Sequence, residues 1–127
     1  DVYKRQDYHA CTEVAKKEKN DNARPELKEK VKNMEEYDII FIGFPNWWGT
    51  MAPPVRTFLS QNAAVLKGKT VCLFQTNGGG GMQRCGKEFA ELVPNSKVLP
   101  AQAFSGSSVR SSVKELEKFV TDRITVK

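Results

Sequence analysis

The sequence has few of the residues that build metal centres or nucleophilic sites. Its 127 residues include one histidine, His9, and three cysteines, Cys11, Cys72 and Cys85. Three cysteines cannot all pair with one another, and their spacing matches no metal-binding motif. Nothing near His9 in the sequence supplies a second metal ligand or organises a catalytic base. We therefore expect no metal and no catalytic residue, and we expect reduced thiols, as is usual in the cytoplasm.

Long apolar runs are also missing, so the sequence predicts a cytoplasmic protein without a membrane span. No signal-like segment opens the chain. With 39% hydrophobic and 28% charged residues, the composition is typical of one soluble globular domain. The net charge of +5 does not by itself favour nucleic-acid binding, because Lys16 and Lys17 alternate with Glu13 and Glu18 in mixed-sign faces. We expect neither a nucleic acid nor a membrane as a partner.

What the chain does contain is an apolar run that leads directly into both of its tryptophans. Residues 39–44 show no polar alternation, which predicts a strand buried on both faces of a parallel sheet. Ligands of open parallel sheets bind at the carboxyl ends of the strands. Here the strand is followed by Pro45, Asn46, Trp47, Trp48 and Gly49. The two indoles either cover a flat aromatic ligand or cap the core, and this loop alone favours neither interpretation.

A second strand end has the composition of a ligand-binding loop. The predicted strand 70–75 is followed by Thr76, Asn77, Gly78, Gly79, Gly80 and Gly81. One or two glycines suffice for a turn, and a run of four lets backbone N–H groups approach a ligand without interference from a Cβ atom. A flexible hairpin or linker is the alternative, because glycine-rich loops are a weak signal. If the two strands are neighbours in the sheet, as consecutive strands usually are, the two loops are adjacent.

The rest of the chain alternates helices and strands, which predicts one α/β domain with a doubly wound parallel sheet. Residues 1–22 are expected to be irregular. Helices are predicted over residues 23–34, 53–61, 82–93 and 111–124, and a third strand over residues 98–104. Pro100 places this third strand near an edge of the sheet. Ser112 and Glu115 have the spacing of a capping box at the start of the last helix.

These motifs, in this order, resemble the bacterial short-chain flavodoxins. The resemblance covers about residues 7–122 and rests on residues 37–50, 53–59, 68–70 and 76–80. It implies a flavodoxin-like fold, non-covalent FMN and electron transfer to redox partner proteins or small-molecule acceptors. The two loops would contact the isoalloxazine ring from two sides, with one of the tryptophans against the ring. The implied cofactor-binding residues are Pro45, Asn46, Trp47, Trp48, Gly49, Thr76, Asn77, Gly78, Gly79 and Gly80.

The N-terminal part departs from the flavodoxin pattern. Flavodoxins begin with an apolar strand and a Ser/Thr/Gly-rich loop that holds the FMN phosphate at a helix N-terminus, whereas residues 1–36 are polar and charged. Residues 1–6 resemble a translated transposase adapter, so we expect them to be non-native and residues 7–127 to form a partial flavodoxin-like domain. In the flavodoxin strand order 2-1-3-4-5, this incomplete sheet would hold strands three to five. An unpaired edge would make it marginally stable, and the missing phosphate contacts would weaken FMN binding.

Two other functions stay open at this point. One is a flavin-dependent NAD(P)H:quinone-type reductase, because the fold does not decide between an electron carrier and a reductase. The other is a binding module that has lost flavin and keeps the fold for protein contacts. In such a module, Trp47 and Trp48 would face the core.

Overall fold

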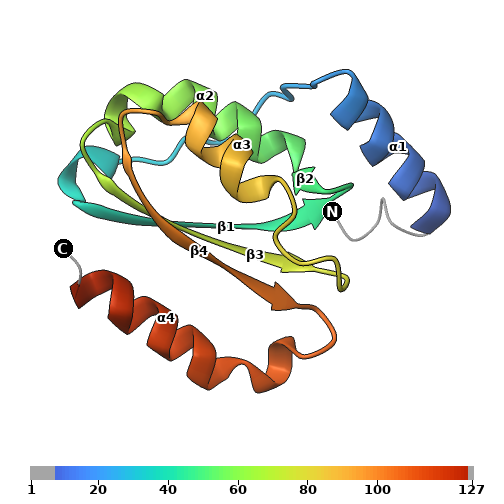
Figure 1. The fold of residues 1–127 in the computed structure, drawn as a ribbon. Coiled ribbons are helices and arrows are strands. Elements are labelled where there is room, and N and C mark those ends of the chain that lie inside the picture. The colour runs from blue at the N-terminus through green and yellow to red at the C-terminus, as the bar shows by residue number, and fades with distance from the viewer. Residues whose placement is uncertain (1–7, 126–127) are drawn as a thin grey trace.

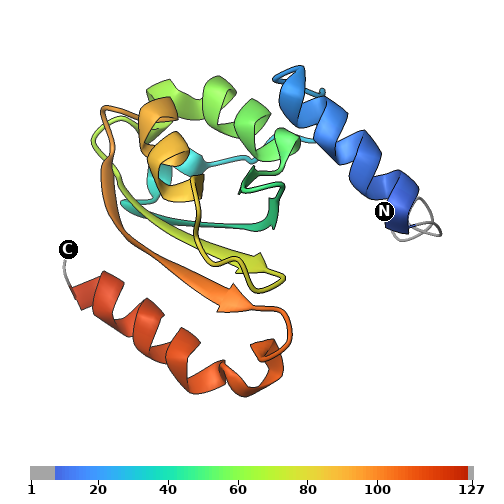
Figure 2. The same cartoon turned by 45° about the vertical axis from the view of Figure 1, so that its right-hand side comes forward.

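The fold is a sheet with helices on both faces, seen in a computed structural model that describes residues 8–125 (Figure 1). The sheet has the order β2-β1-β3-β4, with β1, β3 and β4 parallel and β2 antiparallel to the end of β1. Helices α2 and α3 cover one face, α4 covers the other, and α1 stands apart beside β2 (Figures 1 and 2). The elements are α1 (Tyr8–Asn20), η2 (Met34–Glu36), β1 (Ile39–Trp47), β2 (Thr50–Met51), α2 (Pro53–Leu66), β3 (Thr70–Asn77), α3 (Cys85–Leu92), β4 (Lys97–Ser105), η3 (Val109–Ser111) and α4 (Val113–Thr125). The predicted flavodoxin-like α/β class is confirmed.

Strand β3 lies in the middle of the three parallel strands and is buried from both sides. Val71 and Leu73 pack under α2 and α3, whereas Cys72 and Phe74 face α4. Since successive side chains of a strand point to opposite faces, burial on both sides requires a continuous apolar run. This is the pattern from which the strand was predicted.

Strand β4 lies at the edge of the sheet, as Pro100 predicts. Its register with β3 shifts between Cys72 and Phe74, which pair with Leu99 and Gln102. Proline has no N–H group to donate to a neighbouring strand, so it is tolerated at an edge or in a bulge. Pro100 lies both in the edge strand and at the shift in register.

Two predictions for the N-terminal region are wrong. Residues 8–20 form helix α1 instead of an irregular segment, because the stretch contains no glycine or proline and is rich in helix-forming alanine, glutamate and lysine. Residues 23–33 form an irregular segment with bends instead of a helix. Val31, in the middle of their apolar spacing, is 62% exposed, and short helices with little packing are marginal in water. The proposed adapter, residues 1–6, lies outside the described residues.

Three helix boundaries also differ from the prediction. Helix α2 continues to Leu66, and α3 begins only at Cys85 because Gln83 has a left-handed φ of 46°. Helix α4 begins at Val113. The hydroxyl of Ser112 donates to the carbonyl of Ser108, 2.9 Å away, and so serves the turn before α4 instead of the expected capping box with Glu115.

The outer edge of β1 is open along most of its length. Strand β2 pairs only with Asn46 and Trp47, and within residues 8–125 no strand pairs with the outer edge of residues 39–45. A groove of about 540 Å³ follows this edge and is lined mainly by apolar side chains, among them Ile40, Phe41 and Phe58. The expected unpaired edge is therefore present. None of the helices between residues 8 and 125 has the length and apolarity needed to cross a bilayer.

Phe119 holds α4 against the sheet, so its removal should destabilise the fold. Its ring meets Phe41 and Phe74 edge-to-face at centroid distances of 5.9 and 6.2 Å, and it is 3% exposed. We expect Phe119→Ala to lower the free energy of unfolding by about 3 kcal/mol, measured by urea denaturation. Leu116→Ala is the control on the same helix, because Leu116 is 42% exposed, and it should cost below about 1 kcal/mol. Equal losses in the two variants would contradict this account of α4.

Candidate functional site

The two tryptophans lie in a tight hairpin at the end of β1, which we call the Trp loop (Pro45–Gly49). Trp47 pairs with Thr50, so that Trp48 and Gly49 alone make the turn. Both have positive φ angles, 56° and 80°, as two-residue hairpins with a primed turn require. Gly49 N–H donates to Asn46 Oδ1 at 2.9 Å and closes the turn. A tryptophan in the left-handed region costs about 1–2 kcal/mol, so this geometry stores strain at the tip.

Trp48 faces away from the core. It is 42% exposed, and its Nε1 donates to the backbone carbonyl of Thr12 in α1 at 2.7 Å. The ammonium group of Lys16 lies 5.1 Å from the centre of the Trp48 ring, within reach of a cation–π interaction. The interpretation in which both indoles cap the core is therefore wrong for Trp48. Trp47 is half-buried.

The second loop, residues Thr76–Gly81, begins with the last two residues of β3 and is called the glycine loop. Gly79 and Gly81 have positive φ angles of 127° and 75°, which glycine adopts without strain. A Cβ atom added at Gly78, Gly79 or Gly81 would meet nothing within 4 Å. Asn77 Oδ1 accepts a hydrogen bond from Gly79 N–H at 2.9 Å. One side of the glycine backbone is thus open, while the loop is held by its own asparagine.

Hydrogen bonds join the two loops directly. Asn46 Nδ2 donates to the Gly81 carbonyl at 3.1 Å, and Arg84 N–H donates to the Gly49 carbonyl at 3.2 Å. Asn46 Nδ2 also lies 2.8 Å from Gln83 Oε1. The adjacency predicted from consecutive strand ends is confirmed.

A cavity of about 880 Å³ lies between the two loops and α1. Nine of the ten predicted cofactor-binding residues line it, and Gly79 does not. Sequence reasoning missed the other lining residues, which are Tyr8, Cys11, Thr12, Ala15, Gln83 and Gly106. Gly106 follows β4, so the rule that ligands bind at strand ends would have found it. The residues of α1 gave no signal, because that segment was expected to be irregular.

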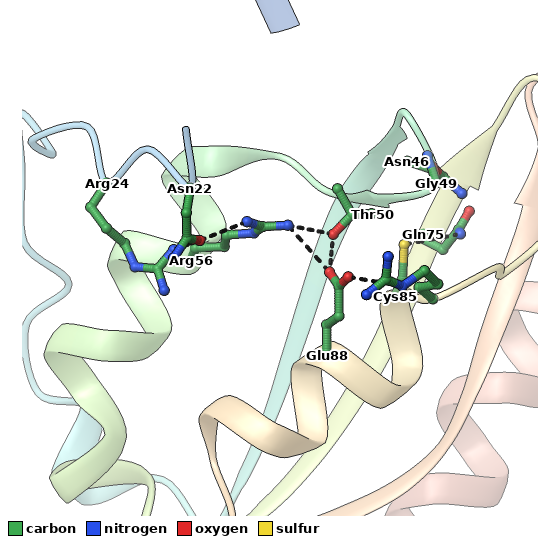
Figure 3. A network of polar contacts seen from close by, with 10 residues as sticks. Asn22, Arg24, Asn46, Gly49, Thr50, Arg56, Gln75, Cys85 and Glu88 are labelled. Carbon is green, nitrogen blue, oxygen red and sulfur yellow. Dashed lines mark hydrogen bonds and ion pairs between the residues drawn. The ribbon is translucent and has the colours of Figure 1, made fainter. Parts of the chain in front are cut away.

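A polar cluster binds Thr50, the residue that follows the Trp loop (Figure 3). Arg56 Nη2 donates to Thr50 Oγ1 at 2.6 Å and forms an ion pair with Glu88 at 3.3 Å, and Thr50 also donates to Glu88. Arg56 Nη1 reaches Asn22 Oδ1 at 2.9 Å. The charged side chains are only 12% and 18% exposed. This cluster joins α2, β2, α3 and the segment that leads from α1.

Cys85 lies beneath the glycine loop as a buried, inert thiol. It has no exposed surface, and the amide of Gln75 approaches its Sγ at 3.7 Å. Burial raises the pKa of the Cys85 thiol to about 11, and the Glu88 carboxylate acts in the same direction. A thiol with so high a pKa is a weak nucleophile at neutral pH.

The cavity walls are suited to holding a flat, uncharged group. No aspartate, glutamate, lysine or arginine appears among its lining residues in the described part of the chain. Stacking on Trp48 and hydrogen bonds from open glycine backbone are the interactions that these walls offer.

The chain is similar to known proteins in sequence and in structure. The family model described as Flavodoxin matches residues 5–121. A candidate flavoprotein from Bacteroides uniformis is 30% identical with a TM-score of 0.71, and the match covers 88% of this chain and 70% of that one. A candidate flavoprotein from Bacteroides eggerthii is 28% identical with a TM-score of 0.65, over 82% of this chain and 67% of that one. A flavoprotein from Lactobacillus acidophilus, solved in complex with FMN, is 26% identical with a TM-score of 0.63, over 83% and 69%. No curated protein sequence matches.

The raised pKa of Cys85 predicts a loss of stability in alkaline solution. The pKa rises from an ordinary value of 9.0 to about 11, so the folded state favours the protonated thiol. The resulting stabilisation is fully present below pH 9 and is lost as the pH rises through 11. We expect the free energy of unfolding to fall between pH 9 and 11, measured by urea denaturation, and to fall less steeply in Cys85→Ala. Burial also raises the pKa of the Cys72 thiol, and this accounts for the fall in stability that remains in Cys85→Ala. Identical pH profiles in the two proteins would contradict this assignment.

Proposed function

Because the chain belongs to the flavodoxin family, we propose that it binds FMN non-covalently in the cavity between α1, the Trp loop and the glycine loop, and that it acts in electron transfer. The partners that we propose are redox proteins or small-molecule electron acceptors in the cytoplasm of a bacterium. The cytoplasmic location is supported by Cys11, Cys72 and Cys85, all of which are free thiols.

The observation that carries this proposal is the placement of an exposed indole opposite open glycine backbone. Trp48 offers a ring for stacking, and Gly78, which also lines the cavity, offers backbone beside which an added Cβ atom would meet nothing within 4 Å. The cavity volume of about 880 Å³ lies within the range of 300–1,000 Å³ that is usual for sites of small ligands and cofactors. The complex of the Lactobacillus acidophilus flavoprotein with FMN supports the same ligand.

The residues of the cavity fit the isoalloxazine ring of FMN better than its phosphate. A neutral, partly aromatic lining suits a flat ring, whereas a phosphate prefers cations or a cluster of N–H groups. When bound, FMN supplies the one- and two-electron redox chemistry. The Trp loop and the glycine loop would position the ring and exclude water from it. Since the lining that residues 8–125 provide contains no cationic side chain, this environment disfavours added negative charge on the ring.

Parallel titrations with FMN and riboflavin test the proposal on the chain as it stands. Quenching of flavin fluorescence should saturate with both ligands at similar concentrations, because the described lining recognises the ring. Failure to quench either flavin would support a binding module without flavin. If the flavin-loaded protein oxidises NAD(P)H with a quinone in the steady state, the protein is a reductase and not an electron carrier.

Replacing Trp48 should weaken flavin binding and leave the stability of the ligand-free protein nearly unchanged. Trp48→Asn removes the stacking surface, and we expect the Kd for FMN to rise about tenfold. Asparagine adopts the left-handed conformation of this turn position with less strain than tryptophan. This gain offsets the loss of the hydrogen bond to Thr12 and of the contact with Lys16. The free energy of unfolding should therefore change by less than about 1 kcal/mol. Fluorescence titration and urea denaturation measure the two quantities.

Trp48→Phe is the matched control, because it keeps a stacking ring at the same place. Its Kd should stay within about threefold of the original, since an aromatic pair contributes about 0.5–1.5 kcal/mol beyond the buried area. If the asparagine variant binds FMN as tightly as the phenylalanine variant, Trp48 does not contact the ring.

A further inference from the structure

Gln75 is a fully buried amide on the core-facing side of β3. It has no exposed surface and follows Val71 and Leu73 on the side of β3 covered by α2 and α3. Burying a primary amide is unfavourable unless both its donors and its acceptor find partners. The position therefore calls for an explanation beyond packing.

Both ends of the Gln75 amide are hydrogen-bonded. Nε2 donates to the Gly81 carbonyl at 3.0 Å and approaches the Met82 carbonyl at 3.4 Å, and Oε1 accepts from Asn77 Nδ2 at 3.1 Å. One side chain thus connects the start of the glycine loop, its end and the segment that leads into α3. The close-up in Figure 3 shows Gln75 beside Cys85 at this junction.

The carbonyl of Gly81 receives donors from two different strands. Gln75 reaches it from β3, and Asn46 reaches it from β1 at 3.1 Å. Asn46 in turn accepts from Gly49 N–H. The left-handed φ of 75° at Gly81 orients this carbonyl in a way that other residues rarely adopt. A continuous series of hydrogen bonds therefore runs from Gln75 through Gly81 and Asn46 to the Trp loop.

From this geometry we propose that Gln75 is a positioning residue that sets the spacing between the glycine loop and the Trp loop, and through it the affinity for flavin. The inference rests on the proposed function. Gln75 does not line the cavity, so it acts through the Gly81 carbonyl and not by contact with the ligand. Without its amide donors, the Gly81 carbonyl keeps, among the hydrogen bonds of the described residues, only the one from Asn46, and the end of the glycine loop loses its side-chain hydrogen bond to β3.

The test compares Gln75→Met with Thr57→Val. Methionine has a similar length and shape but cannot donate to Gly81. Thr57 is also buried and donates a hydrogen bond, from Oγ1 to the Pro25 carbonyl at 2.7 Å, but it lies in α2 and does not line the cavity. Thr57→Val therefore controls for the loss of a buried hydrogen bond elsewhere in the fold.

Two readouts are needed, one with flavin and one without. The first is the Kd for FMN from fluorescence titration. The second is the exchange rate, measured by NMR in the ligand-free protein, of the Gly79 N–H and of the Arg84 N–H, which joins the Trp loop to the start of α3. In Gln75→Met we expect about a tenfold rise in the Kd and about tenfold faster exchange. In Thr57→Val both should stay within about twofold.

Gln75→Glu adds a readout that a purely structural role would not move. An ionised carboxylate cannot donate to Gly81, whereas the protonated acid donates one O–H. FMN affinity in this variant should therefore recover as the pH falls, while Thr57→Val shows the same pH profile as the unchanged protein. If Gln75→Met does not fold, the pH dependence of FMN affinity in Gln75→Glu tests the positioning role in its place.

The outcomes separate this inference from the proposed function. If the unchanged protein does not bind FMN, the proposed function fails, and the exchange rates still show whether Gln75 sets the spacing of the loops. If flavin binds but Gln75→Met leaves both the Kd and the exchange rates unaltered, the positioning role is overturned.

Discussion

The parallel pairing of β1 with β3 is the constraint on which the rest of the structure depends. The register runs without a break from Ile39 opposite Thr70 to Pro45 opposite Thr76. Because the strands are parallel and in step, both leave the sheet at the same edge, and the Trp loop and the glycine loop begin one strand spacing apart, about 4.8 Å. A shift of one residue would turn every apolar side chain of β1 to the opposite face. Because Ile42 and Phe44 are buried on one face of β1, this register also fixes the geometry of the cavity.

Several groups near this edge of the sheet would lower the stability of the fold if their neighbours did not compensate them. Trp48 adopts a left-handed conformation, Gln75 is a fully buried amide, and Arg56 and Glu88 form an ion pair that is largely withdrawn from water. Each is tolerated because neighbouring groups compensate it with hydrogen bonds. Their concentration at one end of the sheet is typical of a site in which geometry matters more than stability.

The sequence was most informative where a pattern had one structural solution. An apolar run buried on both faces predicted the parallel strands, and strand order placed nine of the ten proposed residues around one cavity. The prediction failed where contacts from distant residues decide the conformation. Residues 23–33 have the spacing of a helix but lack a surface for Val31, and α3 starts late because Gln83 is left-handed. Likewise, the role of Gln75 depends on a carbonyl six residues away whose orientation no local pattern encodes.

The walls of the cavity differ in how firmly they are held. The Trp loop and the glycine loop continue strands of the sheet and are joined through the Gly81 carbonyl, so moving either one would disturb the core. Helix α1 has no buried residue. The contacts described for it are polar and lie at the surface, chiefly those of Thr12 and Lys16 with Trp48. Regions with few buried apolar contacts open at the lowest free energy. Since one of the attachments of α1 is the same indole that would stack on a flavin, the position of this helix and the orientation of Trp48 depend on each other.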